Sequence, residues 1–199
     1  MTMWDERYSQ PGFLFGTEPA NFLVAHEAYL ARGLTGLAVA DGEGRNSVFM
    51  AEKGVKTRAL DASEVGIEKA RGLAAARSAP VEFVLADLRT WAWEENAYDL
   101  VVAIFIQFAD PAFRAEIFDG MKRTVKPGGH LLLHGYTPEQ VDLGTGGPRA
   151  RENMYTPDLL RDAFGDMDIL RLEAYEAEIG EGAGHSGRSA LIDLVARKI

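Results

Sequence analysis

Short apolar runs alternate along the first 134 residues with segments whose apolar positions recur at helical spacing. The periodic segments predict helices that begin near residues 17, 45, 63 and 111. Strands that alternate with helices in this way predict an α/β protein with a mostly parallel sheet. The predicted strands, each short, apolar and bounded by turn residues, are 37–40, 56–60, 81–85, 98–105 and 130–134.

The pattern changes after residue 134. Residues 135–155 are rich in glycine, proline and polar side chains, which predicts a long loop on the substrate side of the domain. A short helix is expected at 156–164, followed by strands at 169–178 and 189–197. The glycine-rich connection 180–187 predicts that these last two strands pair antiparallel.

A chain of 199 residues is long enough for one sizeable core and too short for two ordinary domains. We therefore expect a single domain spanning residues 1–199. Its predicted fold class is α/β: a Rossmann-like three-layer αβα sandwich with a mostly parallel seven-stranded sheet and an antiparallel last strand.

Composition argues against several classes of function. The formal net charge of −9 disfavours nucleic acid and anionic lipid as partners. The absence of cysteine excludes disulfides, thiol nucleophiles and cysteine zinc sites, and the four scattered histidines predict no metal site. The sequence has neither a signal-peptide pattern nor an apolar run of membrane length, so we expect a cytoplasmic protein with no membrane partner. No feature specifies the oligomeric state, and a monomer is compatible with the sequence.

The first chemical signal is the pair Gly42-x-Gly44 between a predicted strand and a predicted helix. Glycine lets the backbone approach a ligand closely, and the free N–H groups at a helix start point at that ligand. The same pair is compatible with a tight turn that binds nothing. The turn therefore indicates a nucleotide site only together with other residues.

Two acids follow the next two strands. Asp61 lies about 19 residues after Gly42, at the spacing at which an acid accepts the ribose hydroxyls of an adenosine; alternatively, it caps the next helix. Asp87 follows the third strand and either accepts the adenine amino group or closes a turn. Because the carboxyl ends of parallel strands share one edge of a sheet, the glycine turn and these acids together predict an adenosine site.

Local charge distinguishes between candidate cofactors. A dinucleotide fingerprint has a third glycine where this chain has Ser47, and that motif seats a pyrophosphate. Here the expected crevice is acidic, with Asp41, Glu43, Asp61 and Asp87. Acids suit a cofactor that carries a sulfonium and an ammonium group, so S-adenosylmethionine is favoured over NAD.

Several motifs make the chain resemble the class I S-adenosylmethionine-dependent methyltransferases over nearly its whole length. They occur in that family's order: the glycine turn, residues 60–71, Ala86-Asp87-Leu88, residues 98–102 and Lys126-Pro127-Gly128-Gly129. Residues 4–8 and 15–19 are similar to the small-molecule branch that contains tellurite-resistance (TehB-like) and thiopurine methyltransferases.

The resemblance implies S-adenosyl-L-methionine as the cofactor. Gly42 and Gly44 would meet its methionine part, Asp61 its ribose, and Asp87 its adenine. The segment 1–33 would form an N-terminal helix and lid, in which Tyr8 covers the sulfonium or packs in the core. The full set of cofactor-binding candidates is Tyr8, Asp41, Gly42, Gly44, Asn46, Asp61, Ala62, Asp87, Leu88 and Phe105.

One departure from the family pattern concerns the ammonium group of the cofactor. The family usually places an acid where this chain has Ala38, and a glycine where it has Ala40. An alanine at position 38 cannot bind the ammonium. We therefore expect Asp41 or Glu43 to supply the charge from the turn itself.

Methyl transfer depends mainly on alignment and desolvation of the reactants, so the sequence specifies no catalytic residue. Tyr136, Tyr155 and His185 are candidates, and each is also open to a structural interpretation. The predicted activity is methyl transfer (EC 2.1.1.-) to a small molecule, with thiols and chalcogen species as possible acceptors. An NAD-dependent oxidoreductase and a non-catalytic S-adenosylmethionine-binding protein remain the alternatives.

Overall fold

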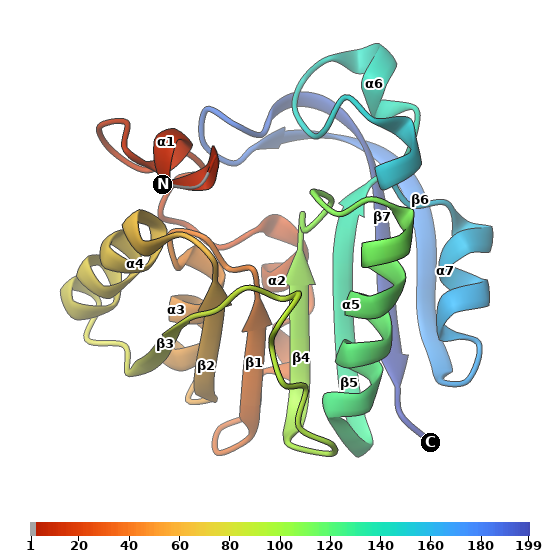
Figure 1. Cartoon of the computed structure of the whole chain (residues 1–199), viewed down its shortest axis with the longest axis horizontal. Coiled ribbons are helices and arrows are strands. Elements are labelled where there is room, and N and C mark those ends of the chain that lie inside the picture. Colours follow the sequence, from red (N-terminus) through yellow and green to blue (C-terminus); the bar gives the residue numbers. More distant parts are fainter. Residues whose placement is uncertain (1–2) are drawn as a thin grey trace. The chain divides into compact units, whose positions relative to one another are not determined.

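A computed structural model describes residues 3–199 (Figure 1). The strands are β1 (Thr35–Val39), β2 (Lys56–Asp61), β3 (Val81–Leu85), β4 (Tyr98–Ile104), β5 (Val125–Tyr136), β6 (Asp168–Gly180) and β7 (Ser186–Arg197). The helices are α1 (Met3–Tyr8), α2 (Asn21–Ala25), α3 (Arg45–Glu52), α4 (Glu64–Ala76), α5 (Pro111–Thr124), α6 (Gln140–Leu143) and α7 (Pro157–Phe164), with 3-10 helices η1 (Glu27–Tyr29) and η2 (Arg151–Asn153). Within residues 3–199, no helix combines the length and the apolar character needed to cross a membrane.

The seven strands form one mixed sheet in the order β3-β2-β1-β4-β5-β7-β6, flanked by helices. β1 and β3 run parallel to β2, and β4 runs parallel to β5. The last strand, β7, is antiparallel to both of its neighbours, β5 and β6. The predicted Rossmann-like α/β fold, with seven strands and an antiparallel last strand, is therefore confirmed.

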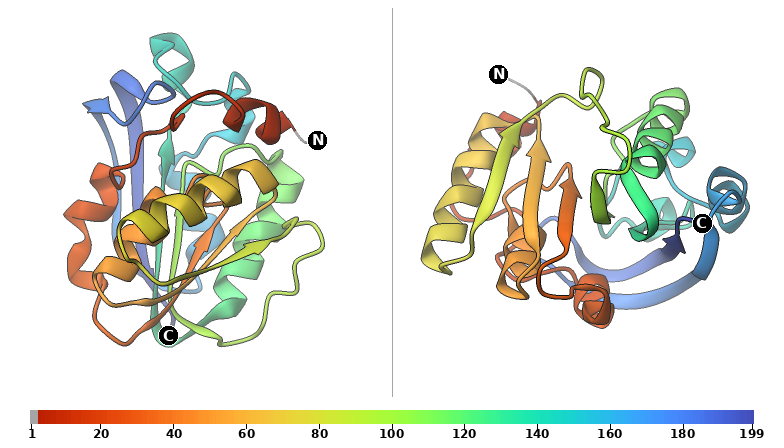
Figure 2. Two further views of the ribbon diagram at one scale, coloured as in Figure 1. Left: turned by 90° about the vertical axis from the view of Figure 1, so that its left-hand side faces the viewer. Right: turned by 90° about the horizontal axis from the view of Figure 1, so that it is seen from below.

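The chain divides into two compact parts, and the first comprises Met1–Ala92 together with Glu181–Gly184. It holds β1–β3 and helices α1–α4, with α4 alongside the strands β2 and β3 (Figure 2). Apolar side chains of α3 and α4, including Val48 and Leu73, pack against Phe83 of β3. The residues that follow β1–β3 lie at one edge of the sheet, because these strands are parallel.

The second part comprises Trp93–Gly180 together with His185–Ile199 and holds β4–β7. Its strands β6 and β7 form a long, curved hairpin (Figure 2). Tyr136, the last residue of β5, pairs with Leu191 of β7 and belongs to a buried apolar cluster with Met154 and Ile179. The carboxyl end of β5 is therefore anchored in the core of this part.

The helix predicted to begin near residue 17 begins at Asn21, so Pro19 precedes the helix instead of opening it. The backbone before it is bonded elsewhere in the first part. The Thr17 carbonyl accepts a hydrogen bond from Arg77 (3.0 Å), and the Ala20 N–H donates to Asn46 Oδ1 (2.9 Å). The sequence pattern also did not predict α1. Of the predicted lid segment 1–33, residues 1 and 2 lie outside the described residues.

The segment 135–155, predicted as a loop, is partly ordered. β5 continues to Tyr136, and α6 and η2 lie within the segment. Gln140 accounts for much of this order, because its fully buried side chain accepts from Ala190 N–H (2.8 Å) and donates to Thr145 Oγ1 (2.9 Å). These bonds attach the segment to β7.

Candidate functional site

The glycine turn after β1 has the backbone that its sequence predicts. Gly42 (φ +64°) and Gly44 (φ +92°) are both left-handed, and Gly44 is the N-cap of α3. A Cβ on Gly42 would lie 2.6 Å from the Tyr8 hydroxyl, and one on Gly44 would lie 2.7 Å from Ala70 Cβ. Both positions therefore need glycine for packing within the protein and for their left-handed backbone.

Asp41 turns its carboxylate onto the start of α3. Its oxygens accept hydrogen bonds from the Ser47 backbone N–H (3.2 Å) and hydroxyl. Burial raises the pKa of Asp41 from 3.8 to about 7, and the nearby Asp61 carboxylate adds to the rise. The positive end of this helix is thus already served by a carboxylate of the chain itself.

Asp61 ends β2 and connects it to the turn. One carboxylate oxygen accepts from Gly42 N–H (2.8 Å), and the other accepts from Ser63 N–H (2.8 Å). Ser63, not Asp61, caps α4, because its hydroxyl accepts from Gly66 N–H (3.0 Å). The capping interpretation of Asp61 is therefore wrong. Burial raises the pKa of the Asp61 carboxyl.

Tyr8 of α1 is buried over this turn, and its ring also fills the space beside Gly66. Burial raises the pKa of the Tyr8 hydroxyl, and the carboxylates of Asp61 and Glu43 raise it further. The surroundings of the turn are thus negatively charged, as the sequence predicted.

Two other candidates in the turn hold the N-terminal segment. Glu43, only 3% exposed, accepts from Leu14 N–H (2.8 Å) and pairs with Lys69 Nζ (3.0 Å). The Asn46 carboxamide oxygen accepts from Ala20 N–H. Glu43 is therefore already neutralised, which leaves Asp41 as the stronger candidate for the charge missing at Ala38.

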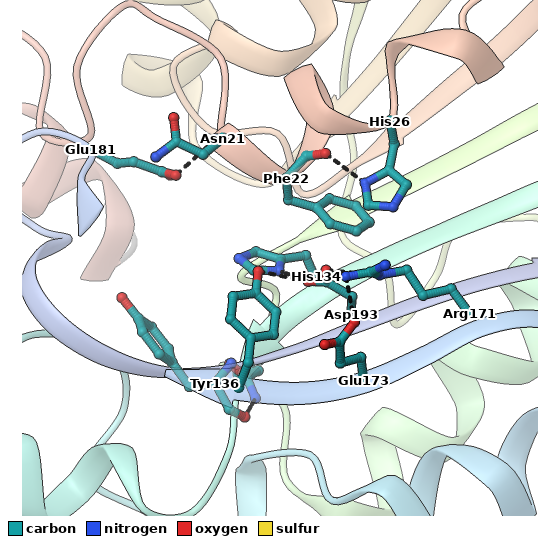
Figure 3. Close-up of polar contacts among 11 residues, drawn as sticks. Asn21, Phe22, His26, His134, Tyr136, Arg171, Glu173, Glu181 and Asp193 are labelled. Atoms are coloured by element: carbon teal, nitrogen blue, oxygen red, sulfur yellow. Dashed lines mark hydrogen bonds and ion pairs between the residues drawn. The ribbon is translucent and has the colours of Figure 1, made fainter. Parts of the chain in front are cut away.

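The sequence analysis missed a buried ion pair in the same part of the chain. Arg45 Nη2 lies 2.8 Å from Glu181 Oε2, and both side chains are almost fully buried. The other oxygen of Glu181 accepts from Asn21 N–H at 2.9 Å (Figure 3). No local signal could have found this pair, because its members are 136 positions apart.

The adenine-side candidates lie at the end of β3. Asp87 is exposed, and its side chain accepts from Arg89 N–H (2.9 Å), which is the turn-closing alternative. Leu88 is buried, whereas Ala62, beside Asp61, is exposed. An exposed carboxylate in such a turn keeps acceptor capacity for a further donor.

In the second part, Phe105, Tyr136 and His185 come together. The Tyr136 hydroxyl is hydrogen-bonded to His185 Nδ1, and the Phe105 ring stacks on His185 with a centroid distance of 4.2 Å. Tyr155 is instead a core residue: it is 1% exposed, packs on Phe118, and burial raises the pKa of its hydroxyl. Of the three catalytic candidates, the structure thus brings two into direct contact.

His134 has a structural partner that the sequence did not indicate. Its Nδ1 lies 2.7 Å from Asp193 Oδ1, and the two residues are paired across β5 and β7 (Figure 3). Asp193 also accepts from Arg171 Nε (3.3 Å) and the Tyr175 hydroxyl (3.2 Å). These donors satisfy a buried carboxylate. Across residues 3–199, no group of three or more His, Asp or Glu side chains is arranged to hold a metal ion.

Comparison with known proteins gives one family match. Residues 37–129 match a family model described as a methyltransferase domain. A comparison with curated proteins found no match.

Solved structures with low sequence identity share the fold. One, from a study of the conversion of a disulfide bond into a thioacetal group during echinomycin biosynthesis, has a TM-score of 0.77 at 18% identity and covers 98% of this chain and 90% of that chain. TehB from Haemophilus influenzae has a TM-score of 0.74 at 17% identity, covering 98% of this chain and 66% of that chain. Magnesium protoporphyrin IX methyltransferase (ChlM) from Synechocystis, with bound SAH, has a TM-score of 0.66 at 17% identity and covers 89% and 78%. Residues 37–129 therefore match a methyltransferase-domain model, and the chain shares the Rossmann-like fold of these methyltransferase structures, the fold that its motifs predicted.

Proposed function

We propose that this protein is an S-adenosylmethionine-dependent methyltransferase that acts on a small-molecule acceptor, with thiols and chalcogen species as the first acceptors to test. The observation that carries the choice of cofactor is the carboxylate of Asp41 at the start of α3. A pyrophosphate needs the free N–H groups of such a helix start. Here it would meet a carboxylate, whereas a cationic cofactor gains from the same charge.

The carboxylates around the turn fit S-adenosylmethionine. Asp41 is assigned to its ammonium group, Asp61 to the ribose hydroxyls, and Asp87 with Leu88 to the adenine. When bound, the cofactor supplies a methyl group activated by a positive sulfur. The task of the chain is then to bind, align the acceptor and exclude water.

Neighbouring structures support the small-molecule class. ChlM is named for a porphyrin acceptor, and the echinomycin-related structure is named for chemistry at a disulfide. The formal net charge of −9 also supports a small acceptor over a nucleic acid. We retain the cytoplasm as the proposed location from the sequence alone.

Calorimetry with S-adenosylhomocysteine, S-adenosylmethionine and NAD tests the cofactor. We expect micromolar binding of the first two, about −8 kcal/mol, and none of NAD. Binding of NAD alone would instead favour the oxidoreductase. Turnover is then measured on a panel of thiols, selenols and tellurite; cofactor binding without turnover on any member would favour a non-catalytic binding protein.

A further inference from the structure

Three rings converge at one end of the second compact part. Phe105 directly follows β4, Tyr136 is the last residue of β5, and His185 directly precedes β7. The Phe105 ring lies 4.2 Å from the His185 ring and 4.7 Å from the Tyr136 ring, measured between centroids. The carboxyl ends of parallel strands form the ligand-binding edge in open α/β sheets. The ring cluster therefore stands at the edge where an acceptor is expected.

The backbone holds these rings in place at some cost. Phe105 has a φ of +56°, a left-handed conformation that is strained for a bulky residue; such strain occurs in turns and clusters at active sites. Its N–H donates to the His134 carbonyl (2.9 Å). The buried side chain of Gln107 binds both the N–H (2.7 Å) and the carbonyl (2.8 Å) of Tyr136. The backbone around the cluster is thus fixed from two strands.

The glycine-rich segment 144–147 is also built around this cluster. Gly146 forms an isolated antiparallel bridge with His185. A Cβ on Gly147 would lie 2.8 Å from Tyr136 Cδ2, so only glycine lets the segment pass the ring. This contact explains the glycine at position 147, which cofactor binding does not.

Resting on the proposed function, we propose that His185 and Tyr136 form the acid–base pair that removes the proton from the methyl acceptor. The acceptor O–H or S–H donates to His185 Nε2, while the Tyr136 oxygen accepts from His185 Nδ1–H. As the acceptor oxygen or sulfur bonds to the methyl carbon, its proton moves to Nε2. The bound cofactor would supply the methyl group, and its sulfur would keep the electron pair of the broken carbon–sulfur bond. The proton then passes to water, and the products are the methylated acceptor, S-adenosylhomocysteine and H⁺.

The pair also specifies an acceptor class. A base helps only when the acceptor carries its proton at the working pH, as alcohols, phenols and aliphatic thiols do. Tyr136 is 1% and His185 6% exposed, so the acceptor must displace part of the packing around them. Phe105, which is half-buried, gives such an acceptor a flat apolar surface.

The experiment compares two acceptors in wild type, His185→Gln and Tyr136→Phe. Benzyl mercaptan is protonated at neutral pH, whereas 4-nitrothiophenol is ionised. We expect His185→Gln to lower kcat/KM about a hundredfold for benzyl mercaptan and less than threefold for 4-nitrothiophenol. Tyr136→Phe keeps the ring and should show the same selectivity with a smaller loss. His130→Gln, the same change at a half-buried histidine within β5, is the control. Thermal unfolding and S-adenosylhomocysteine affinity verify that each variant is folded.

A second readout needs no turnover. 4-Nitrophenol changes colour on ionisation, so its visible absorption with the S-adenosylhomocysteine complex reports whether it is bound as phenolate. In the presence of wild type, we expect a larger phenolate fraction than in buffer alone. With His185→Gln, we expect the same fraction as in buffer. An equal loss of kcat/KM for both thiols, or an unchanged phenolate fraction in the variant, would overturn the acid–base role of His185 and Tyr136. Either result would leave the proposed function intact. A wild-type protein that binds cofactor but methylates no acceptor would overturn both.

Discussion

At the scale of single residues, Asp41 and Glu43 divide two tasks that the sequence left open. Glu43 is buried, paired with Lys69 and bonded to Leu14, so its charge serves the N-terminal segment. Asp41 is less buried, and within residues 3–199 the hydrogen bonds that its carboxylate accepts come from Ser47 at the helix start. An incoming ammonium group can therefore join Asp41 without breaking an ion pair.

Asp41→Asn should weaken binding of S-adenosylmethionine about ten- to hundredfold, because a charge-assisted hydrogen bond contributes about 1.5–3 kcal/mol. Methylthioadenosine lacks the ammonium group, and its affinity should stay within about twofold. Calorimetry on both ligands isolates the effect. Glu43→Gln is the matched control and should show no such selectivity. A selective loss in Glu43→Gln, with none in Asp41→Asn, would reverse the assignment.

The candidate cofactor residues could be predicted because they follow strands, and strand ends can be read from apolar runs and turn residues. The residues to which they are hydrogen-bonded within the protein could not be predicted. Asn46 was predicted to face the cofactor, but its side chain binds the Ala20 backbone, 26 positions away. The contact between Tyr136 and His185 joins residues 49 positions apart, with α6, α7 and β6 between them in the chain. Sequence spacing carries no information on such contacts.

At the scale of elements, the N-terminal segment is attached to α3 and α4 by polar contacts. Asn46 binds Ala20, and Lys69 Nζ donates to the carbonyls of Gln10 (2.9 Å) and Gly12 (2.6 Å). Apolar side chains add to these bonds, since Tyr8 is buried beside Gly66 and Phe13 packs on the cluster that contains Leu73. Removing one polar contact at a time tests how far each one holds the backbone of the segment.

Asn46→Ala should speed hydrogen exchange at the amide of Ala20 and at the amides of α2 that follow it. The change leaves a buried N–H without its acceptor, which costs about 1–3 kcal/mol. Exchange followed by mass spectrometry measures the effect, and the amides of β2 should stay protected. Lys53→Ala removes an exposed ion pair with Glu27 and serves as control, since such a pair contributes less than about 1 kcal/mol. Unchanged exchange at Ala20 would mean that Asn46 does not hold the segment.

The sequence predicted the strands better than the short helices. Strands β1, β3 and β4 are short, mostly apolar runs, a local property, whereas β5 begins at Val125, before the apolar run from which it was predicted. The start of α2 is set by where the backbone of residues 17–20 finds its partners, in α3 and at Arg77. Likewise, the order of α6 depends on Gln140 reaching Ala190. Both depend on tertiary contacts that no periodicity reveals.

At the scale of the whole molecule, the buried acid of the turn couples folding to pH. The pKa of Asp41 is raised from 3.8 to about 7 by burial, so the native state binds this proton more tightly than the unfolded state does. The contribution of this proton to the stability of the native state is present at low pH, and it is lost as the pH rises towards 7 and Asp41 ionises. The repulsion that comes with a net charge of −9 also grows with pH, so wild type alone cannot isolate this effect.

Comparing wild type with Asp41→Asn removes that background. Between pH 4 and 7, the free energy of unfolding of wild type should fall relative to the variant, and the difference should become constant above about pH 8. Denaturant unfolding of both proteins at each pH measures this difference in the free energy of unfolding. Asp119→Asn alters an exposed carboxylate and should give a nearly flat difference. A wild type that gains stability relative to Asp41→Asn across this range would contradict the raised pKa.

The tip of the long hairpin has a consequence for how the protein is made. Glu181–Gly184 belong to the first compact part, where Glu181 neutralises Arg45. On the ribosome, residues 1–92 emerge well before this tip. Until the tip arrives, the chain has either an unpaired arginine charge in its interior or an unfinished N-terminal segment. Contacts this distant in sequence slow folding, so residues 1–92 should mature only after the tip has been synthesised.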